Sequence, residues 1–411
     1  MYEMGEQTER VILAGVQTSE SDDTVQSLFE LRELAETAGA MTVGSVMQSR
    51  EAIHPATYLG KGKLEELKEM IFSLDATGVI CDDELTPAQL NNMERELECK
   101  IMDRTMVILD IFAGRARTSE GKIQVELAQL KYRAARLVGM RASLSRLGGG
   151  IGTRGPGEKK LEVDRRLIHQ RIGQLKAQLS EVTKHRELIR SHRERNRSKV
   201  AAIVGYTNAG KSTLLNKLTG AGVLEEDKLF ATLDPTTRVL DLPGKQQILL
   251  TDTVGFIRKL PHHLIEAFKS TLEEAKYADI ILHVVDASNP QRDQHMYVVY
   301  DTLRQLGVSD KKVITLFNKQ DLCTDKEQLR DFQADHILRI SAKTGEGLDE
   351  LSSLLEQVIQ ENQVYIERVF PYTKAGQIAL IRKYGQVTKE EYLDEGIAVK
   401  AYVPMEIYHQ I

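Results

Sequence analysis

A glycine-rich turn between an apolar strand and a helix contains the residues with the clearest chemistry in the sequence. Residues 199–213 read KVAAIVGYTNAGKST, with an apolar strand over 200–204 and a helix beginning near Ser212. Gly205 and Gly210 allow the backbone to fold around an anion. Lys211 can place a positive charge between the β- and γ-phosphates, and the Ser212 hydroxyl can bind Mg²⁺. The pattern predicts a phosphate-binding loop with nucleotide contacts from Gly205, Tyr206, Thr207, Asn208, Ala209, Gly210, Lys211, Ser212 and Thr213.

A second motif follows the apolar strand 248–250 and supplies a carboxylate for the metal ion. The sequence there is TDTVG, and Asp252 stands at a strand end, where it can hold the Mg²⁺ shell. Gly255 can offer its backbone N–H to a γ-phosphate. We therefore expect contacts to the nucleotide from Asp252, Thr253, Val254 and Gly255.

A third motif predicts which base is bound. The apolar strand 312–317 ends in Asn318, Lys319, Gln320 and Asp321. An ionised Asp321 only accepts hydrogen bonds, so it can pair with the N1–H and 2-amino groups of guanine, whereas adenine leaves it unpaired. Such discrimination can reach about 10⁴-fold. A further segment at the end of a weak strand is expected to lay backbone over the base, and it comprises Ser341, Ala342 and Lys343.

These motifs, in this order, match the Ras-like translation-factor GTPases, and three longer runs resemble the HflX family of ribosome-associated GTPases. The runs are FATLDPTTR at 230–238, DTVGF at 252–256 and GGGIGTRGPGE at 148–158, and the resemblance covers nearly the whole chain. It implies that Thr232 belongs to the first switch and closes on Mg²⁺ in the GTP state. With the resemblance, the predicted metal ligands are Ser212, Thr232 and Asp252, and the predicted catalytic residues are Lys211, Thr232 and Gly255. The added nucleotide-binding residues are Phe230, Ala231, Thr232, Leu233 and Asp234.

One position departs from Ras-type catalysis. Ras has a water-orienting glutamine directly after the glycine of the second motif, where this chain has Phe256, and the family shares that apolar residue. A phenyl ring cannot hydrogen-bond a nucleophilic water. Unaided hydrolysis should therefore be slow, about 10⁻⁴ to 10⁻² per second. We expect a partner to complete the site.

The composition is that of an ordinary soluble protein with several domains. The chain has 411 residues, of which 41% are hydrophobic and 28% charged, so two to four domains are expected. There is no run of about 18 apolar residues for a membrane span, and the first residues lack the apolar core of a signal peptide. We expect a cytoplasmic protein. The cysteines Cys81, Cys99 and Cys323 lie far apart, which favours free thiols over a disulfide or a metal site.

The charge is distributed unevenly. Between Lys131 and Lys199 the sequence has nineteen lysines and arginines against six acidic residues, a net charge of +13. Because the whole chain carries −5, the remainder carries −18. A basic block of this kind is typical of binding to a phosphate backbone.

Changes of periodicity divide the chain into four predicted domains, and the fold class is α/β. Residues 1–120 predict a small βαβ domain with a parallel sheet, with strands at 10–17, 41–47 and 78–81 and helices at 24–38, 64–74 and 86–97. Residues 121–197 carry two heptad-patterned helices that form a basic antiparallel hairpin, the second of which could extend about 55 Å.

The remaining two domains follow the hairpin. Residues 198–363 predict a P-loop GTPase domain, with a parallel sheet, helices on both faces and the nucleotide at the carboxyl ends of the strands. Residues 364–411 predict a small α+β domain, with strands at 364–370 and 396–403 and a helix at 374–384.

The glycine-rich loop at 148–158 joins the two hairpin helices. Glycines permit close backbone approach to a ligand, and charge comes from Arg154, Lys159 and Lys160. A flexible, solvated connector is one interpretation. The other is a loop that inserts into folded RNA, with these three residues binding RNA. The resemblance favours insertion near the peptidyl-transferase region of the large ribosomal subunit.

Three functional hypotheses follow. The leading one is a monomeric GTPase that binds GTP and GDP, associates with RNA and proteins of the large (50S) ribosomal subunit, and remodels or splits ribosomes with ribosome-stimulated hydrolysis. The alternative is a regulatory GTPase switch that binds a protein partner through its coiled-coil arm, which would not need a charge of +13. A third is an ATP-driven RNA remodeller that uses GKGK at 60–63, which lacks the full spacing of a phosphate fingerprint.

Overall fold

The computed structural model describes most of the chain, and this part divides into two compact units. The residues described are 8–19, 23–144, 156–195, 199–220, 222, 229–243, 246–261, 264, 269–323, 329–361 and 363–411. The first unit, which we call the N-terminal unit, comprises residues 1–183, 226–234 and 257–271. The second, the GTPase unit, comprises 184–225, 235–256 and 272–411.

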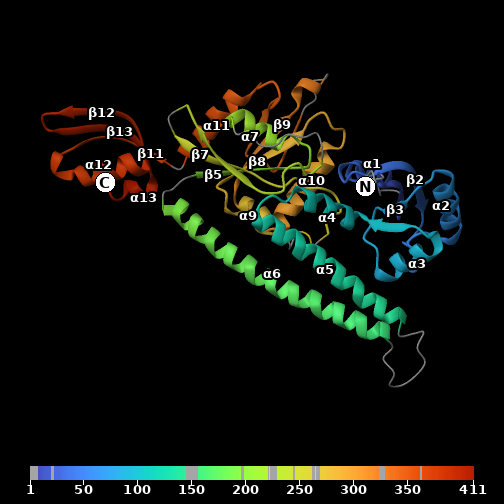
Figure 1. Ribbon diagram of the computed structural model, residues 1–411. Coiled ribbons are helices and arrows are strands. Elements are labelled where there is room, and N and C mark those ends of the chain that lie inside the picture. The colour runs from blue at the N-terminus through green and yellow to red at the C-terminus, as the bar shows by residue number, and fades with distance from the viewer. Residues whose placement is uncertain are drawn as a thin grey trace, which may run out of the picture. The chain divides into compact units, whose positions relative to one another are not determined.

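A four-stranded parallel sheet forms the centre of the N-terminal unit (Figure 1). Its strand order is β2-β1-β3-β4, from β1 (Arg10–Gln17), β2 (Met41–Ser49), β3 (Gly78–Cys81) and β4 (Lys100–Asp103). The helices between and after the strands are α1 (Thr24–Thr37), α2 (Lys61–Ser73), α3 (Pro87–Leu97) and α4 (Arg104–Arg115). The predicted parallel sheet is confirmed. The elements β4 and α4 were not predicted, because no glycine or proline separates the strand residues from the apolar run that follows.

The helical hairpin follows α4 directly. It consists of α5 (Ser119–Leu144) and α6 (Pro156–Arg195), which Figure 1 shows side by side as the longest helices. Arg171 of α6 and Glu126 of α5 join them through two hydrogen bonds of 2.7 and 3.0 Å. On the other side, α5 is fastened to the sheet, because Tyr132 and Arg136 both donate to the buried Asp103 at the start of α4.

A six-stranded sheet forms the centre of the GTPase unit, in the order β10-β9-β8-β5-β7-β6. The strands are β5 (Lys199–Gly205), β6 (Thr236–Asp241), β7 (Gln247–Asp252), β8 (Ile280–Asp286), β9 (Lys312–Asn318) and β10 (His336–Arg339). The helices are α7 (Lys211–Thr219), α9 (Lys269–Tyr277), α10 (Arg292–Gln305) and α11 (Leu348–Gln360). All neighbours pair in parallel except β6 and β7, which are antiparallel. The predicted parallel sheet therefore carries one antiparallel edge, which the short β6–β7 connection allows.

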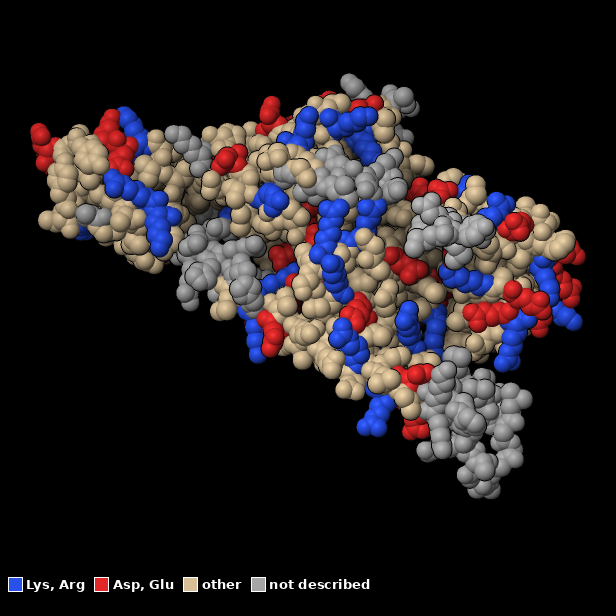
Figure 2. All heavy atoms as spheres, viewed as in Figure 1, with Lys and Arg blue, Asp and Glu red and all other residues tan. Residues whose placement is uncertain are grey.

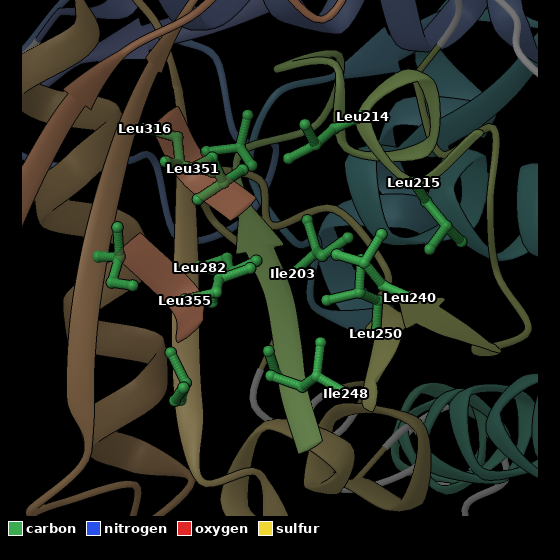
Figure 3. Packing of buried hydrophobic residues seen from close by; sticks show 14 of the residues in the cluster. Ile203, Leu214, Leu215, Leu240, Ile248, Leu250, Leu282, Leu316, Leu351 and Leu355 are labelled. Atoms are coloured by element: carbon green, nitrogen blue, oxygen red, sulfur yellow. The ribbon is translucent and has the colours of Figure 1, made fainter. Parts of the chain in front are cut away.

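Apolar packing fixes the strands that carry the phosphate loop and the base loop. Figure 3 shows Ile203 of β5, Leu282 of β8 and Leu316 of β9 together with Leu351 and Leu355 of α11 in one cluster. All five side chains are fully buried. This packing positions the carboxyl ends of the central strands, from which the phosphate loop and the base loop extend.

The C-terminal segment forms an antiparallel three-stranded sheet in the order β11-β13-β12. Its elements are β11 (Gln363–Phe370), α12 (Ala375–Tyr384), β12 (Gln386–Leu393), β13 (Gly396–Pro404) and α13 (Met405–Tyr408). The α+β pattern is as expected, with β12 added. The residues of β12 are mostly polar and exposed, so an apolar pattern could not reveal it. The division into four domains stays a prediction. None of the described helices is long and apolar enough to cross a membrane.

Candidate functional site

The predicted phosphate loop connects β5 to α7, and two of its glycines are required by their surroundings. A Cβ at Gly205 would overlap the backbone carbonyl of Val284 on the neighbouring strand. Gly210 has a φ of +95°, and a Cβ there would overlap the side-chain amide of Asn318. Because L-residues with side chains rarely adopt such a φ, glycine is the residue that fits this turn. The other loop residues are mostly buried, among them Tyr206, Thr207 and Ala209.

Lys211 lies in the middle of this loop with its ammonium group turned back onto the backbone. Its Nζ donates to the carbonyl of Tyr206 at 2.7 Å, and the side chain is buried. Burial lowers the pKa of Lys211 to about 8, against the attraction of Asp252, and the nearby Lys319 also lowers it. An anionic phosphate would restore the ordinary pKa, because it stabilises the charged amine.

Two hard oxygen ligands meet beside the lysine. The Ser212 hydroxyl donates to Asp252 Oδ2 at 2.8 Å, and Asp252 is fully buried at the end of β7. Mg²⁺ prefers oxygen ligands and keeps several waters or phosphate oxygens in its shell. This donor pair therefore fits Mg²⁺.

The second motif is joined to the phosphate loop by backbone hydrogen bonds. Thr207 N–H donates to the carbonyl of Phe256 at 2.8 Å, and Phe256 N–H donates to that of Gly205 at 3.1 Å. A Cβ at Gly255 would overlap Thr207 Cα and lie 3.0 Å from Lys211 Nζ. Gly255 thus lies against the lysine, and the Phe256 ring is buried and apolar where Ras-type catalysis needs a water-orienting group. Thr253 anchors the motif to β5 through Ile203 O at 2.7 Å.

The predicted base-binding residues form one connected cluster. Asn318 donates from Nδ2 to Ala209 O and accepts at Oδ1 from Ala342 N–H, both at 2.8 Å. Asp321 Oδ1 accepts from the Ser341 hydroxyl at 2.6 Å. Asn318 therefore ties the phosphate loop to the 341–343 segment. Gln320 N–H donates to Ile340 O, and Lys343 lies in the same loop.

Two residues near the nucleotide motifs were not predicted. Asp286 at the end of β8 pairs with Lys319 at 2.8 Å, and His295 of α10 stacks on Tyr206 with ring centroids 3.8 Å apart. Asp286 could have been found, because it follows an apolar strand at the same sheet edge as the other motifs. Nothing in the sequence near His295 signals the stacking.

The remaining predicted residues belong by their residue ranges to the N-terminal unit. Those of the FATLD run from Phe230 to Asp234 belong to the N-terminal unit, and Thr232 among them is half-buried. Arg154 lies outside the described residues. Lys159 and Lys160 lie in the first turns of α6, and their side chains are not described. The assigned contacts of all these residues, and of those in the loop, remain predictions.

The GKGK segment at 60–63 begins α2 rather than forming a loop between strand and helix. Gly60 N–H already donates to Gln48 Oε1 at 2.8 Å, and Lys63 pairs with Glu66 at 2.7 Å. A Cβ at Gly60 would overlap the Arg50 guanidinium. The groups that would receive a phosphate are thus partly occupied by side chains of the same unit, which gives the ATP hypothesis no support.

Comparisons with known proteins identify the family. Three family models match, described as GTP-binding GTPase N-terminal (residues 25–113), GTP-binding GTPase Middle Region (115–193) and 50S ribosome-binding GTPase (200–319). A protein of Lacrimispora saccharolytica named GTPase HflX is 69% identical over 408 residues, which is 99% of this chain and 96% of that protein. One of Escherichia coli K12 with the same name is 40% identical over 410 residues, 99% of this chain and 95% of that one.

A solved structure of SsGBP in complex with GDP is 25% identical and covers 85% of this chain and 98% of its own, with a TM-score of 0.47. The full-length identity to the curated relatives decides the family. Their name and the GTPase domain establish the enzyme class. The chain is a GTP-binding, ribosome-associated GTPase that belongs to the HflX family.

Proposed function

We propose that the GTP-bound chain binds the large ribosomal subunit as a monomer through its basic hairpin, in the cytoplasm, and that it remodels or splits ribosomes there. Contact with the ribosome stimulates GTP hydrolysis, which ends the interaction. The observation that carries this proposal is the buried Phe256, fastened to the phosphate loop where a water-orienting group is needed. A hydrolysis site built in this way depends on a partner.

Different residues of the site bind the phosphates, the metal ion and the base. Lys211 and the backbone of the phosphate loop hold the β- and γ-phosphates, and the Gly255 N–H binds the γ-phosphate. Ser212 and Asp252, with Thr232 added in the GTP state, would hold Mg²⁺, and the bound ion would supply positive charge to the phosphates. Asp321 selects guanine, while the Ser341 hydroxyl holds one of its carboxylate oxygens in place.

The helical hairpin of α5 and α6, which we call the arm, supplies the positive charge that a ribosomal partner requires. Its two helices carry most of the +13 block, and Figure 2 shows basic side chains on them with some acidic ones between. One glutamate of α5 is already neutralised by Arg171. Positive charge near the tip, from Arg154, Lys159 and Lys160, is suited to phosphate groups of RNA.

Co-sedimentation with purified large subunits tests the proposal. We expect the chain with a non-hydrolysable GTP analogue to bind more tightly than with GDP. If six or more arm charges contact phosphates, affinity should fall by about 10³-fold between 50 and 200 mM salt. Reversing the tip charges with Lys159→Glu and Lys160→Glu should weaken binding and flatten the salt dependence. Arg304→Glu on α10, an exposed arginine outside the arm, is the matched control.

Binding that is insensitive to salt, to the nucleotide and to both tip substitutions would contradict the proposal. The arm would then be a coiled-coil module for a protein partner.

A further inference from the structure

The FATLD run at 230–234 is held at both ends by helices of the N-terminal unit. Phe230, only 2% exposed, packs edge-to-face against Phe112 of α4 with ring centroids 4.8 Å apart. Four residues later, Asp234 contacts the start of the arm helix α5. The first switch is thus attached to the helix that leads into the hairpin.

The Asp234 carboxylate completes the N-terminal cap of α5. Its Oδ2 accepts from the N–H groups of Arg117 and Thr118, both at 2.9 Å, and its Oδ1 accepts from the Thr118 hydroxyl at 2.5 Å. Thr118 in turn accepts at Oγ1 from Gly121 N–H at 2.9 Å. Helix N-termini leave four N–H groups without helical partners, and a carboxylate there also interacts favourably with the helix dipole. The cap of α5 is therefore shared between its own Thr118 and a residue more than a hundred positions away.

Gly121 provides the space for this carboxylate. A Cβ at Gly121 would overlap Asp234 Oδ1, although the backbone there is helical and has no positive φ. Glycine is a poor helix former. Its presence in the first turn of a long helix is explained by the room that the carboxylate needs.

Thr232 lies midway between the two attachments. It is two residues from Phe230 and two from Asp234, which is at most about 7 Å of extended chain on either side. A movement of Thr232 larger than this must either release one attachment or carry α4 and α5 with it. The helix α5 is itself fastened to Asp103 through Tyr132 and Arg136.

We propose that Asp234 is a positioning residue that couples the nucleotide state to the arm. When Thr232 closes on the γ-phosphate side of the site, the strain on the 230–234 run is transmitted through the Asp234 carboxylate to the first turn of α5. By thermodynamic linkage, binding of the arm to its target must then favour GTP over GDP by the same factor. The inference rests on the proposed function, because it takes the arm as the ribosome-binding part and Thr232 as the residue that senses GTP.

Two variants break the contact in opposite ways. Asp234→Ala removes the carboxylate, whereas Gly121→Ala displaces the carboxylate and at the same time raises the helix propensity at position 121. If Asp234 served only to stabilise α5, the better helix former at position 121 would offset the lost cap, and any response of the helix start to GTP would persist. If Asp234 transmits the nucleotide state, both variants must lose the response to GTP. Gly114→Ala in α4, where a Cβ meets nothing within 4 Å, is the matched control.

Hydrogen exchange of residues 116–122 in the full chain is the first readout. Between GDP and a non-hydrolysable GTP analogue, we expect a change of about tenfold in wild type and in Gly114→Ala, within the usual range of allosteric coupling. We expect the change to vanish in Asp234→Ala and Gly121→Ala. A wild-type chain without a nucleotide-dependent change, or both variants retaining it, would overturn the inference. Gly121→Ala keeps the test decisive if Asp234→Ala fails to fold.

Affinity for large subunits is the second readout. The ratio of the dissociation constants with GDP and with the GTP analogue should fall to about one in both variants and stay unchanged in Gly114→Ala. A wild-type chain that does not bind subunits would refute the proposed function, while the exchange measurement would still decide the role of Asp234.

Discussion

Two sets of predicted nucleotide-site residues, here called the loop half and the switch half, are held in place in different ways. The loop half, consisting of residues 205–213, 252–256 and 318–321, lies in the GTPase unit. Backbone hydrogen bonds join Gly205 and Thr207 to Phe256, and the Asn318 side chain joins the base loop to Ala209. The switch half, 229–234 and 257–261, lies in the N-terminal unit and is held largely by side chains. The borders fall between Asp234 and Pro235 and between Phe256 and Ile257.

The difference bears on the prediction that the switch half changes with the nucleotide. Backbone hydrogen bonds between strands and loops fix the loop half in one arrangement. Side-chain contacts such as those of Lys259 with Asp82 and Asp83 are the ones that an order–disorder change of this segment would break. The predicted first switch thus belongs to the N-terminal unit, which also contains α5 and most of α6.

The largest expected effect tests the anchor of the switch half. Asp82, fully buried, accepts from Arg104 and the Ser27 hydroxyl, both at 2.7 Å, and pairs with Lys259. Asp82→Ala deprives the buried Arg104 of a charged partner, so the free energy of unfolding should fall by about 3–5 kcal/mol. Urea denaturation measures it. Asp83→Ala, at a partly exposed partner of the same lysine, should cost about 1 kcal/mol or less. Equal losses would show that the anchor is not Asp82.

The loop half is tested by Lys211→Ala. Removing a charge aimed at the transferred phosphate should lower single-turnover GTP hydrolysis by about 10²–10³-fold. Lys217→Ala, an exposed lysine on the same helix, should leave hydrolysis within about twofold. An unchanged rate of hydrolysis in Lys211→Ala would show that Lys211 does not bind the phosphates of GTP.

The same lysine predicts a pH dependence. Burial lowers the pKa of Lys211 to about 8 in the nucleotide-free protein, whereas the nucleotide complex needs the charged amine. Binding must therefore take up a proton above pH 8, and GTP affinity at fixed Mg²⁺ should fall by up to about tenfold per pH unit there. Lys211→Ala should remove this slope. A wild-type affinity that stays constant from about pH 7.5 to 9 would contradict it.

The lowered pKa of Lys211 also affects the free energy of unfolding, which should rise with pH where the affinity for GTP falls. The unfolded chain holds the proton of Lys211 up to its ordinary pKa of 10.5, so it binds more protons than the folded chain above pH 8. The contribution of Lys211 to the stability of the nucleotide-free protein therefore rises between about pH 8 and 10.5. Urea midpoints of wild type and Lys211→Ala across this range measure it.

The smallest expected effect concerns Lys259. Burial alone would lower the pKa of its amine, but Asp82 and Asp83 raise it above the ordinary value. Because the side chain is about a third exposed, Lys259→Met should cost only about 1 kcal/mol of unfolding free energy. High salt should reduce the difference from wild type. Lys276→Met on α9 is the control, and a loss insensitive to salt would indicate apolar packing instead.

Local motifs made the loop half predictable from the sequence. Much of the switch half could not be predicted, because its contacts join residues that lie far apart in the sequence. Gly205, Gly210 and Asp321 stand at fixed spacings after apolar strands, so strand, loop and base contacts could be inferred together. The partners of Asp234 are 116 and 117 positions away, and no local pattern joins them. The same holds for the stacking of His295 on Tyr206. The strand β12 was not predicted because most of its side chains are polar. The N-terminal parallel sheet was predicted because its strands and helices have regular apolar patterns.

GTP turnover tests most directly whether hydrolysis at this site depends on a ribosomal partner. Turnover is measured with and without purified large subunits, at two salt concentrations, for wild type and a chain lacking residues 148–158. We predict slow basal turnover, strong stimulation by subunits, and loss of stimulation with salt or with the deletion. Fast turnover without subunits, or no stimulation at either salt concentration, would contradict the account.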